Sequence, residues 1–194
     1  MARIRIFIAV NIDDSVRTRV AALQAKLART APGVKWVEPE SMHVTLLFLG
    51  EVEELDVVPI CRIVKEHAEG MPPFSLTFKG IGAFPTPRHP KILWAGIPDG
   101  IDDLKRLHGL LEGPLLALGC YRREDRPYSP HLTLGRLTQE DRSEAWGTIL
   151  AQHAEWYGGT SHIRDVLVMR SELIRESPVY SIVGRAKLRG SPPI

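Results

Sequence analysis

The sequence predicts an α+β protein with a bilobal, duplicated architecture, in which two antiparallel sheets face a central cleft and helices lie on the outside. Two observations predict this fold. Strand-like and helix-like stretches follow the order strand, helix, strand, helix, strand twice along the chain, and the pattern His-x-Thr-Leu occurs once in each half, at His43 and at His131. We therefore expect a single two-lobed domain, 1–194, made of pseudo-repeats at about 1–90 and 91–190.

The first half opens with a stretch, 3–10, that is rich in Ile, Phe and Val and favours a β-strand. A helix is expected to follow, from the capping residue Asp13 to about Arg29, because apolar residues recur there at helical spacing. The other elements predicted for this half are a short strand at 35–37, a strand at 42–50, a helix at 53–68 that Pro59 delays or kinks, and a strand at 74–78 that ends in a bulge or turn at Gly80-x-Gly82.

The second half repeats this order. Its predicted elements are a strand at 91–97, a helix from Asp102 or Asp103 to about 118, an extended polar approach at 120–130, a strand at 131–137, a helix at 139–155, a strand at 163–169, a turn at 170–177 and a last strand at 179–188. The two His-x-Thr-Leu patterns lie at equivalent positions in this order, which favours a shared role for them.

Composition fits an ordinary globular protein, since 44% of the 194 residues are hydrophobic and 25% are charged. A net charge of +2 permits a polyanionic ligand without requiring one. The two cysteines, Cys61 and Cys120, have neither a C-x-x-C nor a metal-ligand spacing, which predicts reduced cysteines in a cytoplasmic protein. No apolar run reaches the length of a membrane span, and we expect a monomer.

Each motif is expected to place its histidine and its threonine on one face of a strand, because residues two apart share a face. This pairs His43 with Thr45 and His131 with Thr133. The same alternation assigns Phe48 to the face opposite His43. Two such strands brought face to face would carry one imidazole and one hydroxyl on each wall of a cleft.

Other uses of the histidines are less well supported. A single His-x-Thr in a strand is usually structural, but two in equivalent positions favour catalysis. A catalytic zinc needs three protein ligands, and the sequence has no H-E-x-x-H, H-x-H or Cys/His cluster. It also lacks the G-x-S-x-G elbow of a serine hydrolase and a complete glycine-rich nucleotide loop. We therefore expect no metal site.

Two imidazoles and two hydroxyls suit in-line phosphoryl transfer. With ordinary pKa values of about 6.5, one imidazole can be neutral while the other is protonated. On opposite sides of a phosphorus atom, the neutral ring can take a proton from water and the charged ring can give one to the departing oxygen. The threonine hydroxyls can donate hydrogen bonds to the equatorial oxygens.

The two motifs resemble the signatures of the two-histidine phosphoesterase superfamily. The surrounding segments resemble those of the RNA 2′,3′-cyclic phosphodiesterases, also known as bacterial and archaeal 2′-5′ RNA ligases. These segments are RIFIAV from Arg5, KWVEPE from Lys35, FLG from Phe48 and RPYSP from Arg126. The resemblance extends from the first strand to at least Arg136.

This resemblance implies a bilobal fold, no cofactor, and hydrolysis of RNA ends that carry a 2′,3′-cyclic phosphate to 2′-phosphate ends, with tRNA fragments among the candidate substrates. It also implies roles for five residues: His43 as proton donor to the leaving 3′ oxygen, His131 as proton acceptor from water, Thr45 and Thr133 as phosphate ligands, and Arg136 as an added charge on the phosphate. Strict alternation would turn Arg136 away from His131, so its role requires a bend, for which Gly135 is the candidate.

RNA binding would draw on further side chains. Basic and aromatic residues mix between Tyr121 and Tyr128, as in proteins that bind single-stranded ends, and Tyr128 is the candidate substrate contact there. Phe7 is expected either to stack on a base or to belong to the core. Two alternatives stay open: an enzyme that acts on another 2′-linked or cyclic phosphodiester, and a module that binds RNA ends without turnover.

Overall fold

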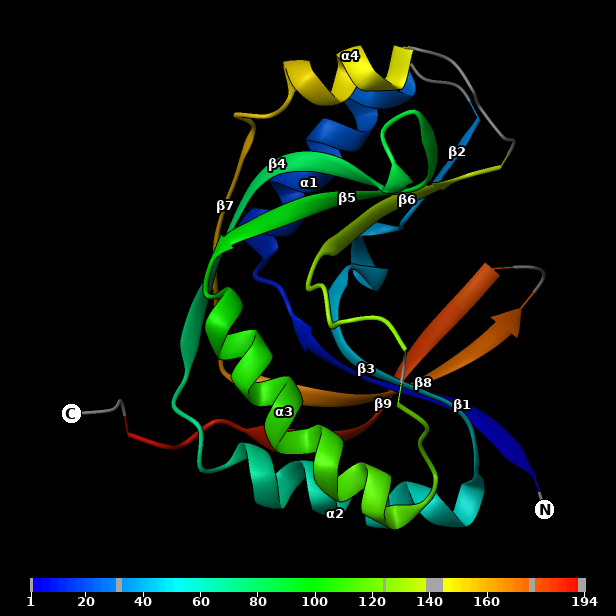
Figure 1. Cartoon of the computed structure of the whole chain (residues 1–194), viewed down its shortest axis with the longest axis vertical. Helices are drawn as coiled ribbons and strands as arrows, with labels where there is room; N and C mark the ends of the chain where they lie inside the picture. The colour runs from blue at the N-terminus through cyan, green and yellow to red at the C-terminus, as the bar shows by residue number, and fades with distance from the viewer. Residues whose placement is uncertain (1, 31–32, 124, 139–144, 175–176, 192–194) are drawn as a thin grey trace.

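The computed structural model describes residues 2–30, 33–123, 125–138, 145–174 and 177–191. Helices and strands are mixed, which confirms the α+β class (Figure 1). The elements of the first half are β1 (Arg3–Asn11), α1 (Asp14–Ala28), β2 (Val34–Trp36), the 3₁₀ turn η1 (Pro39–Ser41), β3 (His43–Glu53), the 3₁₀ turn η2 (Glu54–Asp56), α2 (Val57–Ala68) and β4 (Phe74–Thr86). Those of the second half are β5 (His89–Asp99), α3 (Ile101–Leu118), β6 (Leu132–Leu137), α4 (Ala145–Gln152), β7 (Tyr157–Ile163), β8 (Asp165–Ile174) and β9 (Ser177–Lys187).

The strands form one continuous antiparallel sheet in the order β7-β4-β5-β6-β3-β1-β8-β9, with β2 paired to β6. The two sheets that the sequence predicted are halves of this sheet, and they join where β3 meets β6. The seam between these two motif strands is a single residue pair, Val44 with Leu132. Because each of these residues directly follows a motif histidine, the seam fixes the two motifs beside each other.

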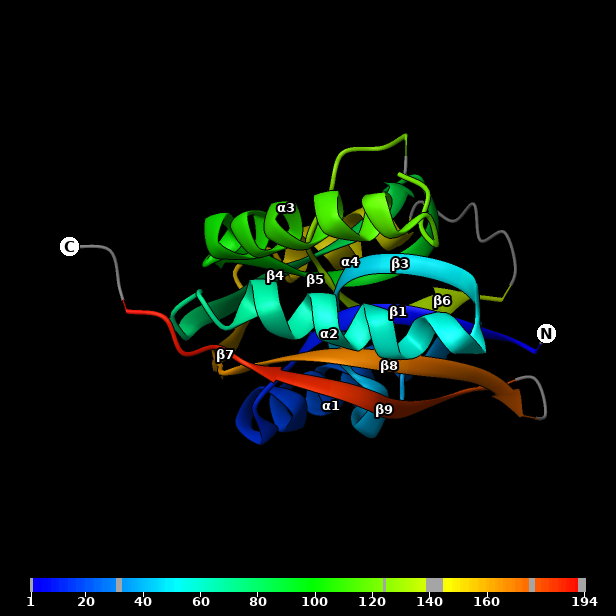
Figure 2. The same ribbon diagram turned by 90° about the horizontal axis from the view of Figure 1, so that it is seen from below.

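The helices lie against the strands in two groups (Figure 1). Helix α1 packs against β7 and α4 packs against β4, whereas α2 and α3 pack against each other and cover β8, β9 and β3. Figure 2 shows α2 and α3 side by side from below. Helix α1, which follows β1, thus lies on β7 of the other half of the sheet, and α4 lies on β4. The buried residues of both halves form one hydrophobic core.

A β-bulge interrupts the first motif strand. The pairing of β3 with β1 passes from Thr45 directly to Leu47 and skips Leu46. An extra residue reverses which face the following side chains occupy. Phe48 therefore shares a face with Phe7, its cross-strand partner, at a ring distance of 6.1 Å. The prediction that Phe48 lies opposite His43 is wrong for this reason.

The second motif strand has its bulge at the equivalent position. The pairing of β6 with β5 passes from Thr133 to Gly135 and skips Leu134, which is buried. The bend that the sequence located at Gly135 is thus a bulge at the preceding residue. It returns Arg136 to the face of the motif threonine.

Several predicted boundaries shift. Pro59 lies in the first turn of α2, where its missing N–H leaves no bond unmade, so the helix begins at Val57 after a 3₁₀ turn. Strand β4 continues past the predicted stop at 79–82, because Gly80 forms a bulge at φ +67°. Helix α3 begins after Gly100, at φ +84°, and not after an aspartate cap.

The C-terminal part differs most from the prediction. The helix expected at 139–155 is α4, Ala145–Gln152, and 139–144 lie outside the described residues. The strand expected at 163–169 corresponds to β8, which continues to Ile174, so the turn expected at 170–177 is wrong. Strand β7 was not predicted. Both cysteines are unpaired. Within the described ranges, no helix has the length and apolar character needed to cross a bilayer.

Candidate active site

Both motif histidines are oriented by the same device. The Nδ1 atom of His43 lies 2.7 Å from the carbonyl oxygen of Ser41, and that of His131 lies 2.7 Å from the carbonyl oxygen of Ser129. A carbonyl oxygen can only accept, so Nδ1–H donates in both rings. The proton on Nδ1 leaves Nε2 as the nitrogen that can exchange a proton with a ligand.

Aromatic rings hold each imidazole from the side. Phe7 lies 4.8 Å from His43 between ring centroids, and Tyr180 of β9 meets the same imidazole edge-on at 5.3 Å. On the other half of the sheet, Phe84 of β4 meets His131 edge-on at 5.0 Å. Each histidine therefore has a fixed ring plane before any ligand arrives, which reduces the reorganisation needed for proton transfer.

The two imidazoles are within electrostatic reach of each other. Burial lowers the pKa of His43 from 6.5 to about 4; the Ser41 hydrogen bond opposes this shift, and the charges of Arg17 and His131 add to it. Burial also lowers the pKa of His131, with the Ser129 hydrogen bond opposing the shift and Arg136 adding to it. Both rings are therefore neutral at pH 7 before a ligand binds, and an anion between them would raise both pKa values.

The motif threonines complete the arrangement. Thr45 and Thr133 are two residues after their histidines and are half-buried. Among the described residues, neither hydroxyl has a hydrogen-bond partner within the protein. Both hydroxyls are thus available to donate to an anion. We call the sheet face that carries His43, Thr45, His131 and Thr133 the histidine face.

Arg136 approaches the histidine face from β6. Burial is the main cause of the lowered pKa of His131, and the charge of Arg136 adds to it. Burial raises the pKa of Tyr180, and the same charge opposes that rise. Arg136 therefore lies near residues of both halves of the sheet. No described carboxylate forms an ion pair with it, so the guanidinium is free to meet an anionic ligand.

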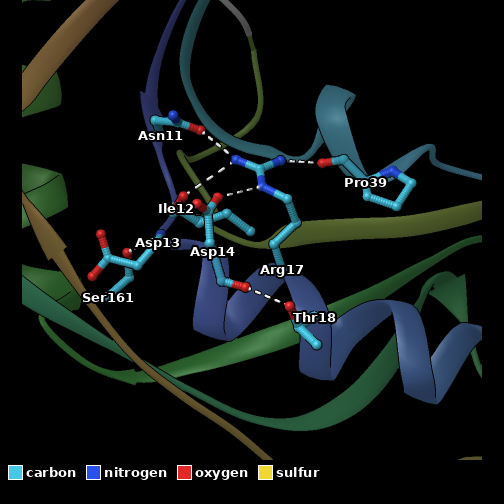
Figure 3. A network of polar contacts seen from close by, with 8 residues as sticks. All are labelled: Asn11, Ile12, Asp13, Asp14, Arg17, Thr18, Pro39 and Ser161. Carbon is cyan, nitrogen blue, oxygen red and sulfur yellow. Dashed lines mark hydrogen bonds and ion pairs between the residues drawn. The ribbon is translucent and has the colours of Figure 1, made fainter.

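Arg17 of α1 is a positioning residue that the sequence did not reveal. Its guanidinium donates to the carbonyl oxygen of Pro39, to Asn11 Oδ1 at 2.9 Å and to the carbonyl oxygen of Ile12 at 3.2 Å (Figure 3). Pro39 begins the 3₁₀ turn that ends at Ser41, the residue whose carbonyl orients the histidine. Arg17 thus joins α1, β1 and this turn.

Arg17 is expected to act on His43 through its charge as well as through the turn. We expect R17Q to raise the pKa of His43, because a positive charge that disfavours the imidazolium is removed. R17K keeps the charge and is expected to hold this pKa near its wild-type value, although it cannot make all three contacts. An NMR titration of the His43 ring measures both effects, with R29Q as the control. An unshifted His43 pKa in R17Q would contradict this role.

Phe7 and Tyr128, the two aromatic residues predicted as candidate substrate contacts, both pack against other residues of the protein. Phe7 is only 3% exposed and packs against His43, so it has no free face for a base and belongs to the wall of the site. Tyr128 donates its hydroxyl to the carbonyl oxygen of Thr45 at 3.0 Å, and its ring stacks on His108 at 4.3 Å. Burial raises the pKa of Tyr128. These contacts tie the approach to β6 onto β3.

Sequence reasoning missed four contributors to the histidine face. Tyr180 and Phe84 lie far from either motif in the sequence, and only the sheet order brings them near. The carbonyl oxygens of Ser41 and Ser129 did leave a signal, because both motifs read Ser-x-His-x-Thr. Within the described part of the chain, no group of three or more His, Cys, Asp and Glu is placed to hold a metal ion.

Comparisons with known proteins identify the family of this chain. Residues 10–94 match the model of the family described as LigT-like phosphoesterases. RNA 2′,3′-cyclic phosphodiesterases from Archaeoglobus fulgidus and Methanothermobacter thermautotrophicus are 36% and 32% identical; the matches cover 91% and 92% of this chain and 96% of each relative.

Solved structures share the fold. A Thermus thermophilus protein superposes with a TM-score of 0.83 at 27% identity, over 97% of this chain and 100% of its own. The structure of Escherichia coli LigT complexed with 3′-AMP superposes with a TM-score of 0.77 at 21% identity, over 96% of this chain and 99% of its own. The chain therefore belongs to the LigT-like phosphoesterase family.

Proposed function

We propose that this enzyme hydrolyses RNA ends that carry a 2′,3′-cyclic phosphate and leaves 2′-phosphate ends, with His43 and His131 as a general acid–base pair. The observation that carries the proposal is the matched orientation of the two imidazoles, each with Nδ1 on a serine carbonyl. His131 also lies close enough for its charge to lower the pKa of His43. The names of the relatives, RNA 2′,3′-cyclic phosphodiesterases, supply the substrate class.

The proposed reaction is a single in-line displacement. A water molecule attacks phosphorus while Nε2 of His131 takes its proton, and the bond from phosphorus to the 3′ oxygen breaks as His43 protonates that oxygen. The product has a 3′-hydroxyl and a 2′-phosphate, so one water is added and one P–O bond is broken. Thr45, Thr133 and Arg136 bind the equatorial oxygens, where negative charge increases.

The bound phosphodiester also explains how His43 obtains its proton. Its pKa of about 4 in the ligand-free protein makes it neutral at pH 7, but the negative charge of the substrate between the two rings raises this value. With a 5′-hydroxyl in place of water, the same displacement forms a 2′-5′ linkage, which we propose as a side activity. The mechanism uses no metal ion.

The test is product identification on a defined oligonucleotide with a 2′,3′-cyclic end. We expect quantitative conversion to the 2′-phosphate, at the same rate in excess EDTA as without it, because proton transfer and charge stabilisation come from side chains. A 3′-phosphate product would contradict the assignment of the leaving oxygen. Loss of activity in EDTA, restored by a divalent cation, would contradict the metal-free mechanism, and tight RNA binding without product would indicate a binding module.

A further inference from the structure

A hollow of about 300 Å³ lies beside the start of β1, where this strand runs between β3 and β8. Its lining comes from β1, β3 and β8. Arginines and glutamates dominate its lining, with an exposed leucine at the edge: Arg3, Arg5, Arg170, Glu51, Glu172 and Leu173. The mechanism uses none of these residues.

The arginines of the hollow differ in what they already bind. Arg170 forms an ion pair with Glu172 at 2.7 Å, and Arg3 donates to the carbonyl oxygen of Glu51 at 3.4 Å. The guanidinium of Arg5 has neither a hydrogen bond nor an ion pair with any other described residue, although Glu51 is its cross-strand neighbour. Arg5 is therefore the cation of this hollow that is free to bind an anion.

Arg5 is also one side chain away from the catalytic imidazole. On adjacent strands, Arg5 pairs with Ser171 and Ser171 pairs with Tyr180. The ring of Tyr180 meets His43 at 5.3 Å. Burial raises the pKa of this tyrosine, and the charges of Arg136 and Arg5 together oppose the rise. One tyrosine thus separates the arginine of the phosphate site from the arginine of the hollow.

Resting on the proposed function, we propose that the hollow binds the phosphate on the 5′ side of the terminal nucleotide through Arg5. A nucleoside 2′,3′-cyclic phosphate carries one negative charge, and an RNA strand adds one more for each preceding nucleotide. A guanidinium is well suited to bind phosphate oxygens in a bidentate manner. The enzyme then prefers a strand, or a nucleotide with a 5′-phosphate, to a bare nucleoside 2′,3′-cyclic phosphate.

The experiment compares adenosine 2′,3′-cyclic phosphate with its 5′-phosphorylated form. The wild type is expected to have a kcat/KM about tenfold higher for the phosphorylated substrate, because one charge-assisted contact is added. R5Q is expected to abolish this preference, and E51Q is expected to increase it by removing a neighbouring negative charge. R62Q, on α2, is the matched control and should keep the wild-type preference.

Salt dependence gives a second readout on an oligonucleotide substrate. Removing one cationic partner of a single-stranded phosphate reduces the slope of log affinity against log salt by about 0.7. R5Q is expected to show a reduction of that size and R62Q none. Equal kcat/KM of the wild type for the two adenosine substrates, or a preference unchanged by R5Q and E51Q, would overturn the subsite. Failure of the wild type to hydrolyse either substrate would instead overturn the proposed function.

Discussion

H43A and H131A are each expected to reduce the turnover of RNA ends with a 2′,3′-cyclic phosphate by at least about a hundredfold. General acid and general base catalysis each contribute roughly 10²–10⁴-fold. Because the two rings serve the same displacement, the double variant should lose much less than the product of the two single losses. Single-turnover kinetics on a defined oligonucleotide measure these effects.

H67A is the matched control, because His67 belongs to α2 and bonds the carbonyl oxygen of Ile63 within that helix. It should keep wild-type turnover. The folds of H43A and H131A should be intact by circular dichroism, since neither ring is fully buried. Wild-type turnover by either variant would contradict a catalytic role for the missing imidazole.

R136Q is expected to reduce kcat/KM by about tenfold to a hundredfold, the range that follows from losing a charge-assisted contact worth about 1.5–3 kcal/mol. It should also raise the pKa of His131, because the Arg136 charge adds to the lowering by burial in the wild type. The limb of the kcat/KM profile that reports His131 should therefore move to higher pH.

R136K separates charge from geometry, since lysine keeps the charge but lacks the planar fork. Compared with R136Q, this variant is expected to bring the pKa of His131 closer to its wild-type value than it brings kcat/KM. R164Q, an exposed position between β7 and β8, is the control and should match the wild type. An unchanged kcat/KM in R136Q would show that Arg136 does not contact the phosphate.

Much of the site could be predicted because its signals are local. The face shared by His43 and Thr45 follows from strand alternation over two residues, and the equivalent pair in β6 follows in the same way. The helices and most strands are also local patterns, and their boundaries shift where Pro59 or Gly80 acts. These features need no knowledge of the partner strand.

The remaining features depend on pairing between distant segments. A bulge is a property of two strands, so the reversal that returns Phe48 and Arg136 to the histidine face could not be read from β3 or β6 alone. Tyr180 reaches His43 only because β8 and β9 extend beside β1. Strand β7 was missed because Gly158 and Gly159 weaken its strand signal.

The lowered pKa of His43 likewise depends on tertiary structure. Burial is its main cause, and Arg17 reaches the histidine from another element. The sequence therefore predicts which groups react, whereas their orientations and the causes of their pKa shifts come from the structure. In the proposed displacement, one imidazole acts on the water that forms the new P–O bond, and the other acts on the 3′ oxygen whose P–O bond breaks.

The most direct test of this claim replaces the 3′ bridging oxygen of the cyclic phosphate by sulfur. A thiolate leaves without protonation, because thiols have pKa values of about 8.5. We predict that H43A cleaves this substrate within about tenfold of the wild-type rate, while H131A stays at least about a hundredfold slower. An equal response of the two variants, whether both are rescued or neither is, would contradict the division of acid and base between His43 and His131.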